Sequence, residues 1–522
     1  MQLDIDLTPE QYLVPSELTR TVARKLCIAP TDVAHVVTVR RSLDSRHGHV
    51  RYHATLQVYN VGEPYSEPDY SSPYRDCTSA DPVVIVGAGP AGLFAALRAL
   101  ELGLRPIIID RGKPVDERKY DIVAITRQGL VNPDSNWCFG EGGAGTYSDG
   151  KLFTRSTKRG DVAAVLRKFV EHGADPSIMV DAHAHIGTDR LSGIISRMRQ
   201  TITEHGGHYL FGTRVVDLKI EGGCVKGVVT ADGNTIDGIA VILATGHSAR
   251  DIYELFNKRQ WALEAKPFAL GVRVEHPQEL INRLQYHTNN PSSLLPPAAY
   301  SLVTQVGGHG VFSFCMCPGG VIVPAATAPR QQVVNGMSNS RRNSPYANSG
   351  IAVTVNPADV PQYTDHGALA LLRFQQDVEQ RMHVATGREA TAPAQRLTDF
   401  CANQASSSIN PTGYMASTAI LPLHELLPPF VTEALRKAFS DFDAKMHGFL
   451  TSQANLLAVE SRTSSPVRIV RDNSGVHPQL PGLYPCGEGA GYAGGIVSSA
   501  LDGIRAIEHV SNVCSRHDIE PQ

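Results

Sequence analysis

The stretch that decides the fold is Asp81-Pro-Val-Val-Ile-Val-Gly-Ala-Gly-Pro-Ala-Gly-Leu-Phe-Ala-Ala-Leu-Arg-Ala-Leu-Glu-Leu-Gly-Leu-Arg-Pro-Ile-Ile-Ile-Asp110. A β-branched run enters the turn Gly87-x-Gly89-x-x-Gly92, an apolar helix follows, and a second apolar strand ends on Asp110. Strand, turn, helix, strand and acid therefore occur in the order of a complete βαβ unit that binds a dinucleotide. The alternative, a glycine-rich turn that binds nothing, does not require this order.

Each part of the unit has a physical role. Gly87 permits the tight turn, Gly89 lets the backbone approach a pyrophosphate, and Gly92 lets helix and strand pack closely. The N-terminus of the helix presents free N–H groups and the positive end of its dipole to the anion. The carboxylate of Asp110 is placed to accept hydrogen bonds from the ribose hydroxyls of an adenosine.

Length and composition limit the number of domains and the class of protein. Its 522 residues predict two or three domains. A hydrophobic content of 42% and a net charge of −3 are typical of a soluble globular protein without general attraction to nucleic acid or anionic lipid. No secretory signal or apolar run long enough to span a membrane is found. Nine scattered cysteines favour reduced thiols, so we expect a cytoplasmic location and no membrane partner.

Residues 1–70 predict a small module of their own. Alternating segments at 3–7, 36–40 and 50–58 and a helix over 15–27 after a Ser16 cap give the order βαββ, which indicates part of a ferredoxin-like fold. Residues 61–80 are typical of a linker. The hairpin is locally basic, and we favour a solvated hairpin over a binding surface. Its basic residues are Arg40, Arg41, Arg46, His47, His49, Arg51 and His53.

The remaining chain predicts an α/β nucleotide-binding domain that is interrupted by a second domain. Residues 81–260 form its first part, with an insertion at 116–205, and residues 478–522 supply a last strand and helix. Between them, residues 261–477 carry alternating apolar runs that indicate a mostly antiparallel sheet, flanked by helices near 365–385 and 428–450.

Two further segments contain the same Gly-x-Gly-x-x-Gly pattern. Gly140-x-Gly142-x-x-Gly145 follows a loop, and Gly489-x-Gly491-x-x-Gly494 lies too near the end of the chain for a following strand and acid. Neither predicts a second nucleotide unit, which argues against a two-nucleotide reductase. The later segment can instead serve the other half of the cofactor held at Gly87.

Several strings make a family resemblance specific. The Gly87 motif, Ala244-Thr-Gly246 and Gly487-Glu488 resemble the FAD-binding set of glutathione-reductase-type flavoproteins. Longer strings resemble a narrower family, the largely uncharacterised bacterial FAD-dependent dehydrogenases, and cover most of residues 81–510. They are Phe139-Gly-Glu-Gly-Gly-Ala-Gly-Thr-Tyr-Ser-Asp-Gly-Lys-Leu152, His185-Ile-Gly-Thr-Asp-Arg-Leu191, Phe314-Cys-Met-Cys-Pro-Gly-Gly320, Asn335-Gly-Met-Ser338, Glu460-Ser-Arg-Thr-Ser-Ser-Pro-Val467 and Gly487-Glu-Gly-Ala-Gly-Tyr-Ala-Gly-Gly495.

The resemblance implies FAD as the cofactor, a Rossmann-type FAD-binding domain with an inserted substrate domain, and a set of cofactor contacts. The wider superfamily usually has Gly-Asp where this chain has Gly487-Glu488, one methylene longer. The implied contacts are Gly87, Gly89, Pro90, Ala91, Gly92, Asp110, Arg111, Val215 and Gly246 for the adenosine diphosphate part, Gly487 and Glu488 for the pyrophosphate and ribityl chain, and Gly143, Ser148, Lys151, Gly494, Gly495 and Ile496 for the flavin.

Glu460 and Arg462 are the candidate catalytic residues. An arginine before the flavin-facing segment can clamp an anionic substrate, whereas the alternative is an internal Glu–Arg pair that ties two domains together. Lys151 and Arg155 can meet phosphate oxygens, or they are solvated loop charges.

Two other pairs have weaker functional interpretations. Cys315 and Cys317 alternate on an expected strand, so both should face one side; we favour small buried thiols over a redox pair. His183-x-His185 has no partners that complete a metal site, so a polar loop or a contact near the flavin is preferred, and no metal is expected.

These observations predict an FAD-dependent oxidoreductase that carries out two-electron chemistry on a small cyclic or unsaturated molecule. NADPH, NADH or another protein is the candidate electron donor. A flavin-dependent monooxygenase is the first alternative. A flavin-bearing factor that binds RNA or protein through its N-terminal module is the second, although the net charge argues against a nucleic-acid partner.

Overall fold

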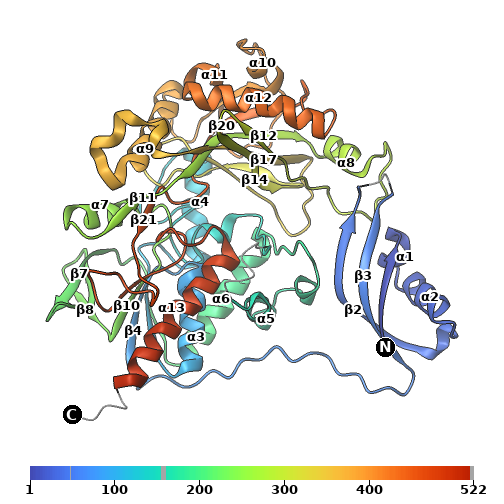
Figure 1. Ribbon diagram of the computed structural model, residues 1–522, viewed down its shortest axis with the longest axis horizontal. Coiled ribbons are helices and arrows are strands. Elements are labelled where there is room, and N and C mark those ends of the chain that lie inside the picture. The colour runs from blue at the N-terminus through green and yellow to red at the C-terminus, as the bar shows by residue number, and fades with distance from the viewer. Residues whose placement is uncertain (47–48, 154–159, 518–522) are drawn as a thin grey trace.

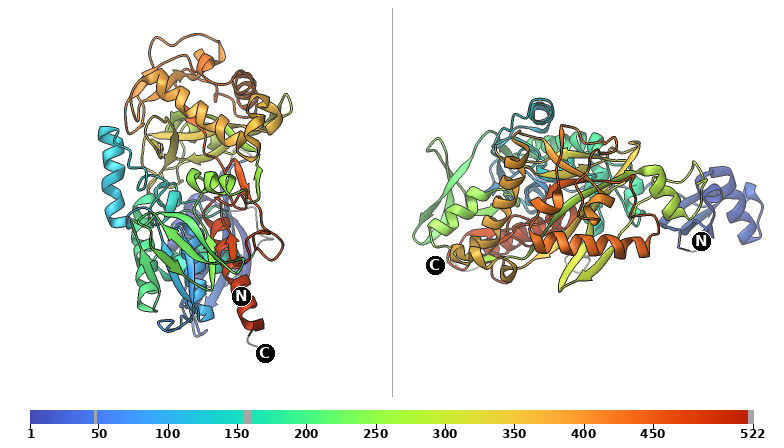
Figure 2. Two further views of the ribbon diagram at one scale, coloured as in Figure 1. Left: turned by 90° about the vertical axis from the view of Figure 1, so that its left-hand side faces the viewer. Right: turned by 90° about the horizontal axis from the view of Figure 1, so that it is seen from above.

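The computed structural model describes residues 1–46, 49–153 and 160–517. A parallel sheet with its helices forms the lower part of the molecule in Figure 1, and a large antiparallel sheet lies above it. The N-terminal module stands to one side, at an end of the longest axis (Figure 2, right). Within the described part of the chain, no helix combines the length and apolar character that a membrane crossing requires.

Five strands form the parallel sheet, in the spatial order β22-β10-β4-β5-β6. The last strand of the chain thus lies beside strands formed hundreds of residues earlier, which confirms an α/β fold with a parallel sheet. The strands are β4 (Pro82–Val86), β5 (Arg105–Ile109), β6 (His208–Leu210), β10 (Ala240–Leu243) and β22 (Leu483–Pro485).

Both faces of this sheet are covered, which explains why its strands are continuous apolar runs. One core packs the sheet against helices, and a second packs it against a three-stranded antiparallel sheet and one further helix. The first layer contains α3 (Pro90–Leu102), α5 (Val162–Glu171), α6 (Thr188–Glu204) and α13 (Ile496–His517). The second contains β7 (Val215–Glu221), β8 (Cys224–Thr230), β9 (Thr235–Asp237) and α7 (Arg250–Lys258).

Seven strands form the upper sheet, in the order β13-β14-β17-β12-β20-β18-β19, antiparallel except for the pair β18–β19. Helices α9 (Ala370–Thr386) and α12 (Pro429–Lys445) pack on it through a core of large apolar side chains. The strands are β12 (Phe268–Pro277), β13 (Val303–Val306), β14 (His309–Cys317), β17 (Tyr346–Val355), β18 (Ala392–Arg396), β19 (Thr418–Ile420) and β20 (Asn455–Glu460).

Four shorter strands and two helices complete the part of the chain that positions the cavity. They are α4 (Val115–Gln128), α8 (Gln278–Tyr286), the hairpin β15 (Val321–Pro324) and β16 (Val334–Met337), and the pair β11 (Leu263–Ala265) and β21 (Val467–Ile469).

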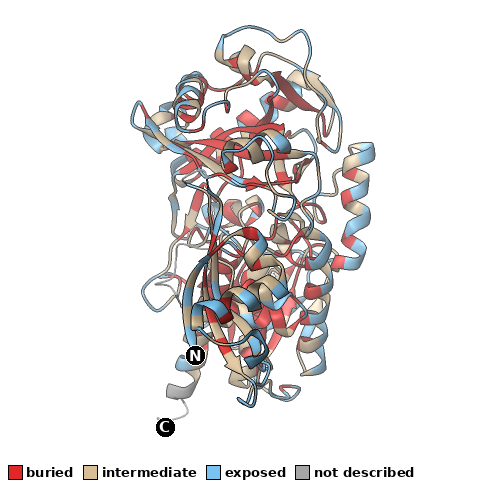
Figure 3. Ribbon diagram, turned by 90° about the vertical axis from the view of Figure 1, so that its right-hand side faces the viewer, coloured by how far each residue is buried: buried red, intermediate tan, exposed pale blue. Residues whose placement is uncertain are grey.

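The N-terminal module forms the antiparallel order β1-β3-β2, which matches three of the four strands of a ferredoxin-like sheet. Its helices turn exposed residues outward and pack inward on a small core of its own (Figure 3). The Ser16 cap is wrong: Val14 is the N-cap, and the helix begins at Pro15, whose fixed φ suits a first turn. Its elements are β1 (Gln2–Leu7), α1 (Pro9–Leu13), α2 (Pro15–Leu26), β2 (Val33–Asp44) and β3 (Arg51–Asn60).

The connection to the main body is shorter than the predicted linker. The backbone over 61–71 is extended and mostly exposed. From Ser72 on the chain is bound, because the hydroxyls of Ser72 and Tyr74 donate to the Glu171 carboxylate at 2.7 and 2.9 Å. The amide of Cys77 donates to the His205 carbonyl. Tyr70 also packs on the core of the nucleotide-binding part. Of the predicted linker, 61–80, the second half is therefore bound to that part.

Three of the basic residues of the hairpin have acidic partners. Arg46 pairs with Asp44 at 2.7 Å, His53 contacts both Asp6 and Asp44, and Arg41 pairs with Asp181 of the main body. His47 lies outside the described residues. These pairs reduce the positive field that a nucleic-acid surface needs.

Candidate active site

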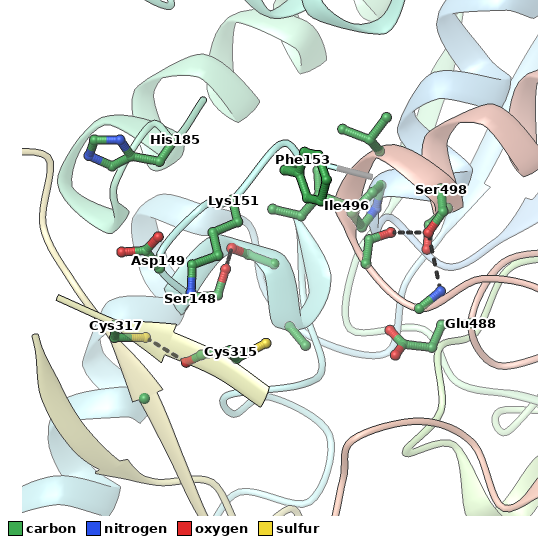
Figure 4. Close-up of a pocket in the computed structure, with 18 of the residues that line it drawn as sticks. Ser148, Asp149, Lys151, Phe153, His185, Cys315, Cys317, Glu488, Ile496 and Ser498 are labelled. Carbon is green, nitrogen blue, oxygen red and sulfur yellow. Dashed lines mark hydrogen bonds between the residues drawn. The ribbon is translucent and has the colours of Figure 1, made fainter. Parts of the chain in front are cut away.

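One large cavity, of about 1340 Å³, lies where the carboxyl ends of the parallel strands face the antiparallel sheet. The residues that follow the strands line it: Gly87 after β4, Asp110 after β5, the segment 244–248 after β10 and Gly487 after β22. Ligands of open α/β sheets bind at this edge. Figure 4 shows how β14, the loop around Lys151 and the start of α13 surround the same space.

The cavity brings together all but one of the residues that the sequence assigned to the cofactor. Gly92 does not line it: a Cβ there would lie 1.9 Å from the Gly87 carbonyl oxygen, so this glycine closes the turn behind the cavity wall. The lining members are Gly87, Gly89, Pro90, Ala91, Asp110, Arg111, Gly143, Ser148, Lys151, Val215, Gly246, Gly487, Glu488, Gly494, Gly495 and Ile496.

Two helix N-termini lie at the cavity and fit a diphosphate and a flavin. Gly87, with φ of +110°, turns the chain so that the first amides of α3 face the space. At the start of α13, a Cβ on Gly494 or Gly495 would meet nothing within 4 Å, so open space lies against the bare backbone. These features suit an elongated anionic dinucleotide, and the residues therefore fit FAD.

Asp110 is engaged more fully than the sequence suggests. Its carboxylate accepts hydrogen bonds from the amides of Ala88 at 2.9 Å, Gly112 at 2.8 Å and Gly140 at 3.1 Å. A carboxylate offers about four acceptor positions, so most of this one fixes the glycine turn and the loop at Gly140. Arg111 next to it lies over the Phe139 ring, 4.5 Å from its centre, and pairs with Asp251.

Glu488 is a protonatable group in the cavity wall. Burial raises the pKa of its carboxyl to about 7, against the opposing attraction of Lys266. A carboxyl that holds its proton near neutral pH can donate a hydrogen bond, whereas an ionised one repels a diphosphate.

Arg462 lines the cavity, but its guanidinium is already held by protein groups. It pairs with Glu379 of α9 at 3.2 Å and donates to Thr327 at 2.6 Å and to Gln331 at 2.9 Å. Arg250 pairs with the same carboxylate at 2.9 Å. Although burial opposes ionisation, the two arginines lower the pKa of Glu379 to about 2.

Glu460 does not line the large cavity and does not pair with Arg462. Its carboxylate lies 3.3 Å from the guanidinium of Arg273, and it borders a small neighbouring cavity of about 20 Å³. Burial raises its pKa to about 7, with Arg273 acting in the opposite direction. The alternative of an internal Glu–Arg pair therefore applies to each residue separately: Glu460 pairs with Arg273 and Arg462 with Glu379, and the two do not pair with each other.

Lys151 extends from the glycine loop toward β14 (Figure 4). Its ammonium donates to the Met316 carbonyl oxygen. Within residues 1–46, 49–153 and 160–517, no carboxylate pairs with Lys151, because nearby Asp149 is bound by Arg342 at 2.7 Å and by Ser338. Arg155, predicted beside it as a phosphate contact, lies outside the described residues.

Cys315 and Cys317 do not face one side as alternation predicts. A β-bulge between Phe314 and Cys317, with φ of +43° at Cys315, breaks the alternation. Cys315 is exposed to the cavity, whereas Cys317 is buried and its thiol donates to the Cys315 carbonyl at 3.2 Å (Figure 4). Both thiols are free, and the expectation of a buried thiol is wrong for Cys315. The surrounding cavity wall nevertheless desolvates this thiol and raises its pKa to about 12.

The two histidines of 183–185 lie in the cavity wall. The His183 ring lies 5.0 Å from that of Phe153, and burial and Arg342 lower the pKa of His185. In the described ranges, no three His, Cys, Asp or Glu side chains are grouped to hold a metal ion.

A parallel-sheet nucleotide fold with glycine turns around one cavity defines a flavoprotein-type site, and family comparisons agree. Residues 82–117 match an FAD binding domain, residues 267–463 an FAD-dependent protein C-terminal domain, and residues 182–285 glucose inhibited division protein A. Residues 1–59 match a domain of unknown function, DUF8436.

A full-length relative shows the family. The chain is 38% identical over 513 residues to an uncharacterised protein of Clostridium beijerinckii, and the match covers 94% of this chain and 95% of the relative. The chain belongs to the same family as this relative, a family of FAD-dependent oxidoreductases within the glutathione-reductase-type superfamily.

Solved structures are more distant. A geranylgeranyl bacteriochlorophyll reductase-like protein from Thermoplasma acidophilum is 13% identical to this chain, with a TM-score of 0.36. The match covers 85% of this chain and 81% of that protein. CtdE in complex with FAD is 11% identical, covers 84% of each chain and gives a TM-score of 0.34.

Proposed function

We propose that this oxidoreductase carries out two-electron oxidation or reduction of a small cyclic or unsaturated organic molecule. The observation that supports this most is the size and lining of the cavity. Its volume of about 1340 Å³ exceeds the roughly 300–1,000 Å³ of ordinary small-ligand pockets. Besides the glycine turns assigned to the cofactor, β14 and the N-terminal module line the same space, so it can accommodate FAD and a second molecule together.

The chain's own residues orient that second molecule. When bound, FAD supplies the two-electron chemistry. Lys151 offers donor hydrogens beyond the one used by Met316, so it can hold a carbonyl or carboxylate oxygen of the substrate. Cys315, exposed on the bulge, presents a protonated thiol to the same space. NADPH or NADH is proposed as a transient donor that enters this cavity.

The absorption spectrum of the purified protein tests the proposal. We expect a flavin band at one FAD per chain that bleaches anaerobically with NADPH, NADH or an oxidisable substrate, and that returns when an unsaturated acceptor is added. A folded protein that takes up no FAD would contradict the proposal. Oxygen uptake that yields a hydroxylated product, instead of peroxide alone, would assign the protein to the monooxygenases.

A further inference from the structure

The N-terminal module is part of the cavity wall. Leu13, Ser42, Leu43 and Tyr52, from α1, β2 and β3, line the same space as the glycine turn and α13. The space therefore extends from the nucleotide-binding edge to the module. A separate recognition domain on a linker would not contribute to the wall of a chamber in the main body.

Specific contacts hold the module against this chamber. The Arg41 guanidinium donates to both oxygens of Asp181, one at 2.8 Å. Backbone bonds run from the Arg41 amide to the Val180 carbonyl at 2.9 Å and from the Ala182 amide to the Arg41 carbonyl at 3.1 Å. Since His183 follows directly, the bridge fixes the module next to residues of the wall.

The part of the wall next to the module is also apolar. Tyr286 at the end of α8, followed by Leu294, Pro296 and Tyr300, lines the cavity. Tyr52 of the module is 7% exposed and stacks on Tyr12 at 4.6 Å, so its ring is rigidly placed. Apolar surfaces on the module and next to it favour an apolar occupant at this end of the space.

Lys151 places a positive charge in the wall of the same cavity. Asp149 is bound by Arg342 and Ser338, and Asp181 is bound by Arg41, so both carboxylates are neutralised. Lys151 donates to a carbonyl and has no carboxylate partner among the described side chains. A cation in this position selects an anionic head group.

We propose that the substrate is an organic carboxylate with an apolar body: its head binds Lys151, and its body extends toward Leu43 and Tyr52 of the module. The inference deepens the proposed function and rests on it. It makes the module an element that determines substrate specificity instead of a separate binding factor.

The test is calorimetric titration of the FAD-loaded protein with octanoate, butyrate and 1-octanol. Each methylene taken out of water strengthens binding roughly fourfold, so octanoate should bind at least about tenfold more tightly than butyrate. 1-Octanol, which lacks the charge, should bind at least about tenfold more weakly than octanoate. Equal affinity for octanoate and 1-octanol, or for octanoate and butyrate, would overturn the inference.

Two variants test which residues contact the carboxylate head of the ligand and which contact its apolar body. Lys151→Met should weaken octanoate at least about tenfold and leave 1-octanol unchanged, with Lys119→Met on exposed α4 as the matched control. Ser42→Trp, which fills the module end without opening its core, should weaken octanoate and 1-octanol alike but not butyrate. Tyr59→Ala, on the same module outside the cavity wall, should change none of them.

The FAD content of each sample distinguishes a failure of the further inference from a failure of the proposed function. The FAD content and dithionite bleaching of every sample are recorded before titration. If FAD is bound and bleaches but octanoate does not bind, the inference fails while the proposed function stands. Absence of FAD from folded wild-type protein defeats the proposed function itself. Loss of FAD from Lys151→Met alone would assign Lys151 to the cofactor and overturn its role as the head-group site.

Discussion

We predict that Glu488 makes FAD binding sensitive to pH. Burial raises its pKa from the ordinary 4.5 to about 7, so the carboxyl is mostly protonated at pH 6 and mostly ionised at pH 8.5. The ionised form would add a negative charge to the cavity that the Gly87 turn also lines, where we expect the diphosphate. We therefore expect the Kd for FAD, measured by fluorescence quenching, to rise roughly three- to tenfold between these pH values.

Glu488→Gln should remove this rise, because the amide does not ionise. Glu275→Gln is the matched control: burial also raises the pKa of Glu275 to about 7, but this side chain lies on β12 outside the cavity wall. The control should keep the wild-type pH dependence of the Kd. A steep dependence that persists in Glu488→Gln would assign it to another group.

Two glycines of the same cofactor site should respond differently to alanine. A Cβ at Gly92 would lie 1.9 Å from a backbone oxygen, so Gly92→Ala should lower the free energy of unfolding by about 3 kcal/mol or more. A Cβ at Gly495 meets nothing within 4 Å, so Gly495→Ala should leave the melting temperature of the FAD-free protein unchanged. It should nevertheless raise the Kd for FAD at least about tenfold, since the methyl group enters the cofactor's space. Normal FAD affinity in Gly495→Ala would place the cofactor elsewhere.

At the scale of the element, the bulge in β14 gives different exposures to two thiols that the sequence places on one side of the strand. N-Ethylmaleimide should modify Cys315, which is exposed to the cavity, well before the buried Cys317. The raised pKa of Cys315 means that modification should accelerate as the pH rises from 7 to 9, since the thiolate is the reactive form. Peptide mass mapping measures the order, and exposed Cys27 serves as an internal reference. Equal modification of both thiols would show that the bulge does not hold them apart in solution.

The same element shows which features the sequence could predict. The unit around Gly87 was predictable because its strand, turn and helix arise from neighbouring residues. The position of Cys315 was not, since a bulge depends on the register of the partner strand β17. The partners of Glu460 and Arg462 were also hidden: Glu379 lies on α9, 83 residues from Arg462, and no local pattern indicates that contact.

At the scale of the whole molecule, docking of the module should not depend on the linker. Chymotrypsin should cut within the segment 61–71, whose backbone is mostly exposed and which contains the half-buried Tyr65 and Tyr70. In the wild-type protein we expect the two fragments to co-elute on size-exclusion chromatography, because the Arg41–Asp181 pair, two backbone bonds and apolar contacts of Leu43 hold them together. Fragments that separate in the wild type would contradict stable docking.

Arg41→Met removes both charge-assisted bonds to Asp181 and leaves the linker intact. The two side chains are 26% and 29% exposed, so water screens the pair, and we take roughly 1.5–3 kcal/mol for the two bonds together. The nicked variant should therefore bind its module roughly ten- to a hundredfold more weakly, and its fragments should separate at micromolar concentration. Arg46→Met is the matched control, since its pair with Asp44 lies within the hairpin and does not cross to the main body. The FAD content should stay the same in both variants, because the residues assigned to the cofactor belong to the main body and not to the module. If Arg41→Met fragments still co-elute, the apolar contacts alone hold the module, and the chamber wall does not depend on the ion pair.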